Sequence, residues 1–176
     1  ATGDIAKVIY TPWFPAGLAY DPVNGTLYVA SPNGYIYVVN PLNGSIINTF
    51  PAFYVPTGIT YDPKNGYIYV TSYNSNDVYV VNPANGNVVA TVGVGQGPNG
   101  IAYDPANGYI YVAVSDSNVV TVIDPDNNSV IANITVKLPY GVAYDPKTGY
   151  LYVTSDYYNS VLVIDPANMS VIGNIS

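Results

Sequence analysis

The sequence predicts an all-β fold, a β-propeller built of four-stranded antiparallel blades. Three observations favour this fold: a repeat of about 42 residues, a turn motif at one place in every repeat, and a composition poor in helix formers. Tyr-Asp-Pro occurs at residues 20–22, 61–63, 103–105 and 144–146, at intervals of 41, 42 and 41 residues. A repeat of roughly 40–45 residues that holds several short strands is typical of propeller blades.

Composition narrows the fold to strands and tight turns. The 176 residues include no Glu, Arg, His or Cys, whereas Tyr (20), Gly (16) and Pro (15) are frequent. Several of the best helix formers are therefore missing, and strand and turn residues are abundant. With 49% apolar residues the chain can build a core, and its length fits a single domain over residues 1–176.

The second repeat shows the order of strands and turns expected in one blade. Residues 58–61, 67–71, 78–81 and 88–92 read as strands, joined by Asp-Pro-Lys-Asn-Gly at 62–66, by residues 72–77, and by Asn-Pro-Ala-Asn-Gly at 82–86. The Asp accepts backbone hydrogen bonds, the Pro presets φ, and the Gly takes a positive φ. The four blades are expected at about 17–50, 58–92, 100–136 and 141–176.

Residues 1–10 add an outer strand that belongs to none of these blades. Residues 3–9 align with the outer strand at 86–92, and residues 170–175 already complete the fourth blade. An orphan strand exposes free backbone groups, so it pairs elsewhere or stays a sticky edge. We therefore expect either a segment of a longer propeller or an inter-chain strand, and favour a multi-chain or larger assembly over a closed four-bladed monomer. That strand comprises Gly3, Asp4, Ile5, Ala6, Lys7, Val8 and Ile9.

The repeats carry a family resemblance. Tyr-Val-Thr-Ser at 69–72 and 152–155, with looser copies at 28–31 and 111–114, resembles the Tyr-Val-Thr-Asn repeat of the YVTN β-propellers, although Ser or Val replaces the last Asn. The Asp-Pro-x-Asn-Gly turns and the Val-Ile-Asp-Pro exits at 122–125 and 163–166 also match. The resemblance implies a cell-surface role, as in archaeal surface-layer proteins, and commonly seven blades, against four repeats here.

Charge excludes some partners. A net charge of −7, with four scattered Lys, argues against nucleic acid, since phosphates require clustered cations. No apolar run approaches the roughly 18 residues of a membrane span, so none is expected. The start at Ala1 suggests a processed N-terminus.

The residue types in the sequence give little support for catalysis or metal binding. Without His, Cys or Glu, most hydrolytic and transition-metal schemes lose their base, nucleophile or ligand. The Asp of the Tyr-Asp-Pro turns reads as structural. Asp77, Asp116 and Asp156 remain, but no loop has the spacing of a calcium site. We expect no enzyme, cofactor or metal, and keep an Asp- and metal-dependent hydrolase as the enzymatic alternative.

Aromatic residues concentrate in loops predicted for one face of the disc. Variable loops on a rigid scaffold often carry recognition, so an aromatic binding or packing face is one interpretation. The other is that these rings plug the mouth of the channel. The residues are Trp13, Phe14, Phe53, Tyr54, Tyr73, Tyr157 and Tyr158.

Six Asn-x-Ser/Thr sequons favour an extracellular glycoprotein, although Asn-rich turns beside Ser also create sequons by chance. They begin at Asn24, Asn43, Asn127, Asn133, Asn168 and Asn174. The sequence thus predicts a non-catalytic extracellular propeller module of a surface layer, sheath or filament. Its partners would be further copies or further blades of a larger chain, and glycan. The alternative is an adhesive propeller that binds carbohydrate or protein.

Overall fold

Sixteen strands in four sheets make up the chain. The structure is a computed structural model and describes residues 5, 7–52 and 54–176. The strands are β1 (Gly17–Asp21), β2 (Thr26–Ser31), β3 (Tyr35–Val39), β4 (Ile46–Pro51), β5 (Pro56–Asp62), β6 (Tyr67–Ser72), β7 (Asp77–Asn82), β8 (Asn87–Gly93), β9 (Pro98–Tyr103), β10 (Ile110–Val114), β11 (Val119–Asp124), β12 (Ser129–Thr135), β13 (Pro139–Asp145), β14 (Tyr150–Ser155), β15 (Ser160–Asp165) and β16 (Ser170–Ile175).

Each sheet is an antiparallel meander of four consecutive strands, and we call the sheets blades one to four. Blade one has the order β1-β2-β3-β4, and the other three repeat this order. In every blade the outermost pair carries a register shift, for example between Val80 and Val81. The all-β propeller fold expected from the repeat is confirmed. No helix in the described part of the chain could cross a membrane.

The turn between the first two strands of each blade follows the expected chemistry. In blade two, Asp62 accepts a hydrogen bond from the Lys64 amide (2.8 Å), and Gly66 has a φ of 76°. The Gly66 amide then donates to the Asp62 carbonyl (2.9 Å). A side chain at Gly66 would be strained by this φ, which explains why the motif ends in glycine.

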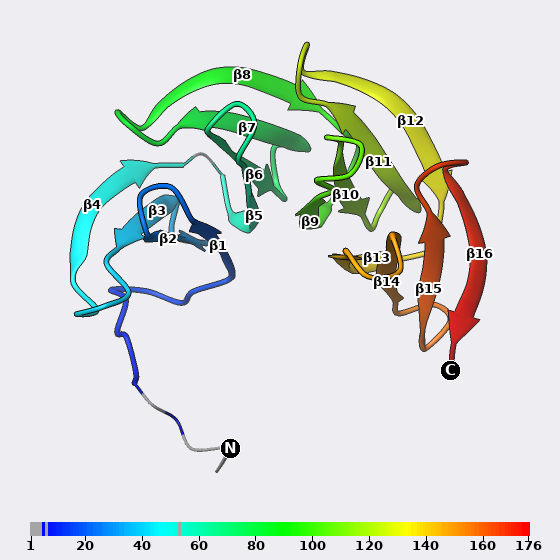
Figure 1. Cartoon of the computed structure of the whole chain (residues 1–176), viewed down its shortest axis with the longest axis horizontal. Coiled ribbons are helices and arrows are strands. Elements are labelled where there is room, and N and C mark those ends of the chain that lie inside the picture. The colour runs from blue at the N-terminus through cyan, green and yellow to red at the C-terminus, as the bar shows by residue number, and fades with distance from the viewer. Residues whose placement is uncertain (1–4, 6, 53) are drawn as a thin grey trace.

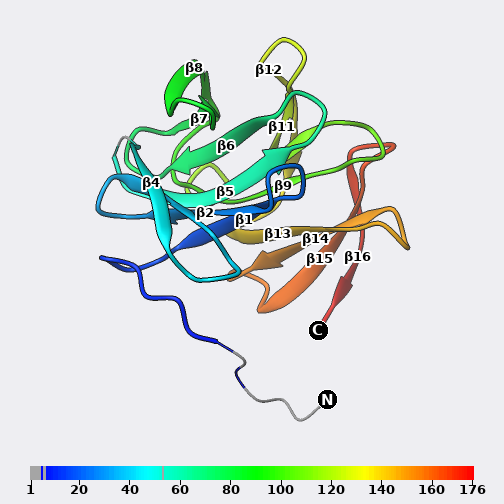
Figure 2. The ribbon, with the colours of Figure 1, turned by 60° about the vertical axis from the view of Figure 1, so that its left-hand side comes forward.

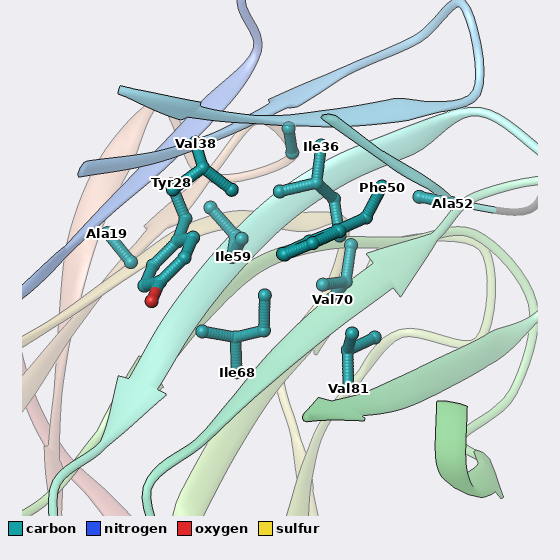
Figure 3. Close-up of a cluster of buried hydrophobic side chains, with 11 residues drawn as sticks. Ala19, Tyr28, Ile36, Val38, Phe50, Ala52, Ile59, Ile68, Val70 and Val81 are labelled. Carbon is teal, nitrogen blue, oxygen red and sulfur yellow. The ribbon is translucent and has the colours of Figure 1, made fainter. Parts of the chain in front are cut away.

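The core lies between successive blades. Figure 3 shows one cluster, in which Tyr28 and Phe50 of blade one meet Ile68 and Val70 of blade two. Equivalent clusters join blade two to three and blade three to four. Both faces of the middle strands of blades two and three are buried and apolar, because each of these two blades is covered by a neighbour on either side.

The four blades lie in chain order along an arc (Figure 1), and blade four does not reach round to blade one. The described residues before β1 run alongside blade one, where Ile9 packs near Val29, Tyr37 and Val39, and Figure 2 shows this segment in dark blue below that blade. Ile5, Lys7, Val8 and Ile9 lie outside the strands, whereas Gly3, Asp4 and Ala6 lie outside the described residues. The expectation that residues 3–9 form an inter-chain strand stays a prediction.

Candidate functional site

The concave inner wall is the most regular surface of the molecule. It is built by β1, β5, β9 and β13, the first strand of each blade. Two hollows open along it. One, of about 400 Å³, is lined by Tyr20, Tyr61, Tyr103 and Tyr144 together with Pro105 and Pro146. The other, of about 450 Å³, is lined by Gly17, Gly58, Gly100 and Gly141 with their neighbours.

Glycines let the inner strands of successive blades approach each other closely. A Cβ atom at Gly17 would lie 2.6 Å from the Thr57 carbonyl oxygen, and one at Gly100 would lie 2.5 Å from that of Tyr140. Such contacts are too short for any side chain. The repeated glycine is thus required by the backbone of the next blade, not by the turn.

Three aspartates lie buried at the end of these strands. Asp21, Asp62 and Asp104 are fully buried, and each accepts a hydrogen bond (2.8 Å) from the amide two residues later. Asp145 makes the same bond to the Lys147 amide (2.9 Å) but is half-buried. As expected from the turn motif, these carboxylates shape the turns.

A second role emerges between the blades, where each buried aspartate faces a tyrosine of the next blade. The Tyr61 hydroxyl faces Asp21. Burial raises the pKa of Tyr61, and the Asp21 charge raises it further. Tyr103 and Tyr144 stand in the same relation to Asp62 and Asp104, and burial and these charges raise the pKa of both hydroxyls. The sequence reasoning missed this pairing, although the recurring Tyr-Asp-Pro triplet contains both partners.

Asp21 stays ionised despite its burial. Burial alone would raise its pKa, but hydrogen bonds from the Asn24 side chain, the Val23 and Asn24 amides and the Tyr61 hydroxyl together lower it below 3.8. The second carboxylate oxygens of Asp62 and Asp104 are buried and lack a hydrogen bond of normal geometry among the described residues. The Tyr103 and Tyr144 hydroxyls face these two carboxylates, and burial, the carboxylate charge and hydrogen bonding all raise their pKa.

The remaining aspartates do not gather. Asp116 accepts a hydrogen bond from the Tyr73 hydroxyl (3.1 Å), and Asp126 forms an ion pair with Lys64 (2.6 Å). Asp77 lies at the start of β7 and Asp156 in the turn after β14. In the described part of the chain, no three acidic side chains come close enough to hold a metal ion.

The aromatic loop residues form separate pairs. Trp13 and Phe14 are in edge-to-face contact, with ring centroids 5.6 Å apart, and lie beside a hollow of about 460 Å³ formed by residues 9–15. Tyr157 and Tyr158 form a second pair, 4.9 Å apart, with Lys137 over the Tyr157 ring.

Among the described residues of this set, Tyr54 and Tyr73 belong to neither pair. Tyr54 is exposed, Tyr73 is half-buried, and Phe53 lies outside the described residues. The described residues therefore form local aromatic patches.

The loops that carry several of these residues are more regular than the sequence indicated. The turns between the second and third strands end in Asn76, Asn118 and Asn159, which all have a positive φ. Asparagine tolerates this conformation well. The irregular loops are thus only those that connect one blade to the next.

All six sequon asparagines have exposed side chains. Asn43, Asn127 and Asn168 lie in the turns before outer strands, and Asn133 and Asn174 lie on the outer strands β12 and β16. Asn24 donates from Nδ2 to Asp21 (2.7 Å), so a glycan on this nitrogen would compete with a hydrogen bond. Asn133 accepts through Oδ1 from Thr121 (2.8 Å), an atom that a glycan on Nδ2 leaves available.

Sixteen strands in four meanders that pack around a concave wall define a β-propeller. The sequence matches the family described as SMP-30/Gluconolactonase/LRE-like region over residues 23–157. The chain therefore belongs to this propeller family. The comparison supports the propeller fold that the YVTN resemblance implied, but it returned a different propeller family and gives no archaeal surface-layer assignment.

Solved structures have a similar fold. A chain of "Kuenenia stuttgartiensis Hydrazine Synthase" is similar with a TM-score of 0.84 and 23% identity, over 98% of this chain and 52% of the other. The present chain thus spans about half the length of that relative. No curated protein matches.

Proposed function

We propose that this chain is a non-catalytic propeller module that acts through contacts with other subunits and with glycan at the cell surface. The observation that carries the proposal is the use of its buried carboxylates. Asp21, Asp62 and Asp104 hold turns and face tyrosines of the next blade, so a structural role accounts for their burial without a catalytic one.

The remaining surface suits contact better than chemistry. The inner wall offers tyrosine hydroxyls, prolines and aliphatic groups, and the outer strands carry exposed sequons. With four Lys and eleven Asp in 176 residues, the surface is weakly charged. A glycan coat would keep such a surface soluble. The mass of protein from its native source is expected to exceed the mass of its own polypeptide by whole sugar units, and a bare polypeptide mass would contradict the glycan contacts.

The family description names a gluconolactonase, so lactone hydrolysis is the enzymatic alternative. The test is hydrolysis of an aldonolactone by the purified chain, with Ca²⁺, Mg²⁺, Mn²⁺ or Zn²⁺ added singly, beside metal analysis of the protein. We expect the rate of the buffer alone and no stoichiometric metal. Turnover that an Asp77→Asn, Asp116→Asn or Asp156→Asn variant abolishes, with Ala106→Lys as a control, would establish an Asp- and metal-dependent hydrolase instead.

A second candidate is an adhesive propeller that binds carbohydrate through its loops. The exposed Trp13–Phe14 pair beside its hollow favours it, because sugars stack on such rings. Trp13 is the only tryptophan, so its fluorescence reports directly on this patch. A saturable change on addition of oligosaccharides, lost in a Phe14→Ser variant and kept in a Tyr158→Ser variant, would support this candidate.

A further inference from the structure

We propose that a second copy of this chain docks its blade one on the open side of blade four, so that two arcs join head to tail. This inference rests on the proposed function for its biological role, since it names the subunit that the module contacts. The argument compares the blade interfaces inside the chain with the two surfaces at its ends.

Blade four exposes a face that its sister blades bury. Ile175 is 55% exposed, whereas Phe50, Val92 and Ile134 at the same place in the other outer strands are nearly buried. Val161 and Val163 are half-buried, whereas their equivalents Val78, Val80, Val120 and Val122 are fully buried. The residue types that bind the next blade elsewhere are thus present on this face of blade four, but in the structure no blade covers them.

Polar groups on this face of blade four match those that form hydrogen bonds between blades two and three. Thr71 of blade two donates from its hydroxyl to the Asn99 carbonyl of blade three (2.6 Å), and the Gly58 amide donates to the same hydroxyl (2.7 Å). In blade four the Gly141 amide donates to the Thr154 hydroxyl (2.8 Å), but Thr154 is exposed. By the repeat, the carbonyl that would accept from Thr154 is that of Ala16 in a second copy.

The space for that backbone is also open. A Cβ atom at Gly17 or Gly100 would collide with the next inner strand, whereas at Gly141 the described atoms within reach belong to Thr154 of the same blade. Gly141 would therefore accept the close approach of a further inner strand as Gly100 does. That strand would be β1 of the second copy.

Blade one carries the complementary surface. Leu18 and Tyr20 on β1 are 67% and 54% exposed, although Ile59 and Ile101 at the place of Leu18 are buried. Tyr20 is the equivalent of Tyr61, which faces Asp21. The half-buried Asp145 at the end of blade four is the equivalent of Asp21. Tyr20 of the second copy would donate to Asp145 and complete this series.

The N-terminal segment covers part of the blade-one surface. Ile9 packs with Leu27, Val29, Tyr37 and Val39, as Phe50 packs on blade two. Lys7 donates to the Leu42 carbonyl (3.0 Å). Ile175 of the second copy would take the place of Ile9, so docking must move Lys7 and Ile9 away from blade one. The segment therefore acts as a removable cover.

The joint is heterologous, since unlike surfaces meet. Two copies related by an axis through the channel would form two identical joints and a ring of eight blades. Eight blades lie within the usual range of propellers. A closed dimer leaves no open blade face, which is why we expect a dimer and not a filament.

The first test is the mass of the 176-residue chain in solution, measured by light scattering over a wide range of concentrations. We expect a rise to twice 18.7 kDa. A Thr154→Lys variant should remain a monomer, because the ammonium group would be buried in the joint. Ala106→Lys is the matched control, since blades two and four carry Lys64 and Lys147 at that place. It should dimerise like the unmodified chain.

A milder variant guards against misfolding. Tyr20→Phe removes one hydroxyl from an exposed side chain of each copy, and it should weaken dimerisation about a hundredfold, because the tenfold effect of one hydrogen bond to a charged group applies at both joints. Circular dichroism and thermal unfolding should be unchanged. A single-chain mass near millimolar concentration, or dimers of Thr154→Lys as tight as those of Ala106→Lys, would overturn the proposal.

Removal of residues 1–10 tests the cover. The truncated chain should dimerise more tightly, because nothing then competes with Ile175 of the second copy. Loss of dimers on truncation would overturn the displacement and favour the inter-chain strand. The proposed function is separable from this test: lactone turnover by a dimer would refute that function alone, whereas a glycosylated, inactive monomer would refute the joint alone.

Discussion

Blades three and four have nearly the same sequence pattern, but only blade three is covered on both sides. Tyr111 of blade three is fully buried and its hydroxyl accepts a hydrogen bond from Asn107 (2.9 Å). Tyr152, the equivalent residue of blade four, is half-buried. The comparison teaches that burial in this protein is decided by the neighbouring blade, since the strands themselves are alike.

The largest difference is expected from truncating these two tyrosines. Tyr111→Ala leaves a large cavity between blades three and four and should lower the free energy of unfolding by about 4 kcal/mol. Tyr152→Ala removes a ring that no blade covers and should cost about 1 kcal/mol. Denaturant unfolding of the monomer at low concentration measures both. Equal losses would show that the open face of blade four is covered in solution.

The next largest difference in stability loss is expected between substitutions at Gly100 and Gly141, the inner-strand glycines of blades three and four. Gly100→Ala places a methyl group 2.5 Å from the Tyr140 carbonyl oxygen, which forces blades three and four apart and should cost about 2 kcal/mol. Gly141→Ala meets only the Thr154 side chain, at 3.3 Å, and should cost less than about 1 kcal/mol. Thermal unfolding checks the pair. A loss at Gly141 as large as that at Gly100 would contradict the comparison.

Alkaline pH should unfold the covered blades. Burial raises the pKa of Tyr69 and of Tyr111 to about 12. Since the unfolded pKa is near 10, their contribution is complete below pH 10 and is lost as pH rises through about 12, at up to about 2 kcal/mol each. Unfolding midpoints across this range, with Tyr69→Phe and Tyr111→Phe as controls, measure the loss. Unchanged pH dependence in both variants would be evidence against it.

The smallest effect concerns the tyrosine hydroxyls of the inner wall. Tyr61→Phe removes a donor from the buried Asp21, so the Asp21 pKa should rise and stability at neutral pH should fall by about 1 kcal/mol. Because the folded pKa of Asp21 is lowered, its contribution is present above about pH 4 and is lost as pH falls through the folded value.

Tyr20→Phe is the matched control, as no preceding blade faces it, and it should not alter monomer stability. Carbon-13 NMR titration of the aspartates reports the Asp21 pKa. An unchanged Asp21 pKa in the Tyr61→Phe variant would mean that its amide hydrogen bonds suffice.

Much of the fold could be predicted, because local chemistry repeats. The Asp-Pro and Asn-Pro turns set the strand ends, and the apolar residues on both faces of the strands from Tyr67 to Val81 indicated a blade between two neighbours. The pairing of Tyr61 with Asp21 could not be derived in the same way, because it depends on the offset between two sheets.

The aromatic loop face stays a prediction, and the structure shows which of its residues lie far apart. Trp13 and Tyr157 belong to blades one and four, which lie at opposite ends of the arc, so a shared side of the disc does not bring them together. The sequence pattern predicts an outer strand over residues 3–9, whereas Ile9 packs on blade one outside any strand. Sequence periodicity cannot distinguish a segment that pairs as a strand from one that only packs against a blade.

The glycine contact between inner strands also bears on how such a chain can evolve. Because Gly17, Gly58 and Gly100 meet the following strand in the same manner, a duplicated repeat of about 42 residues would arrive with both of its joints already made. The duplicated repeat would fit without compensating substitutions, and its deletion would likewise require none. Blade number is thus a quantity that single recombination events can change, while the residues within each repeat stay under the same selection.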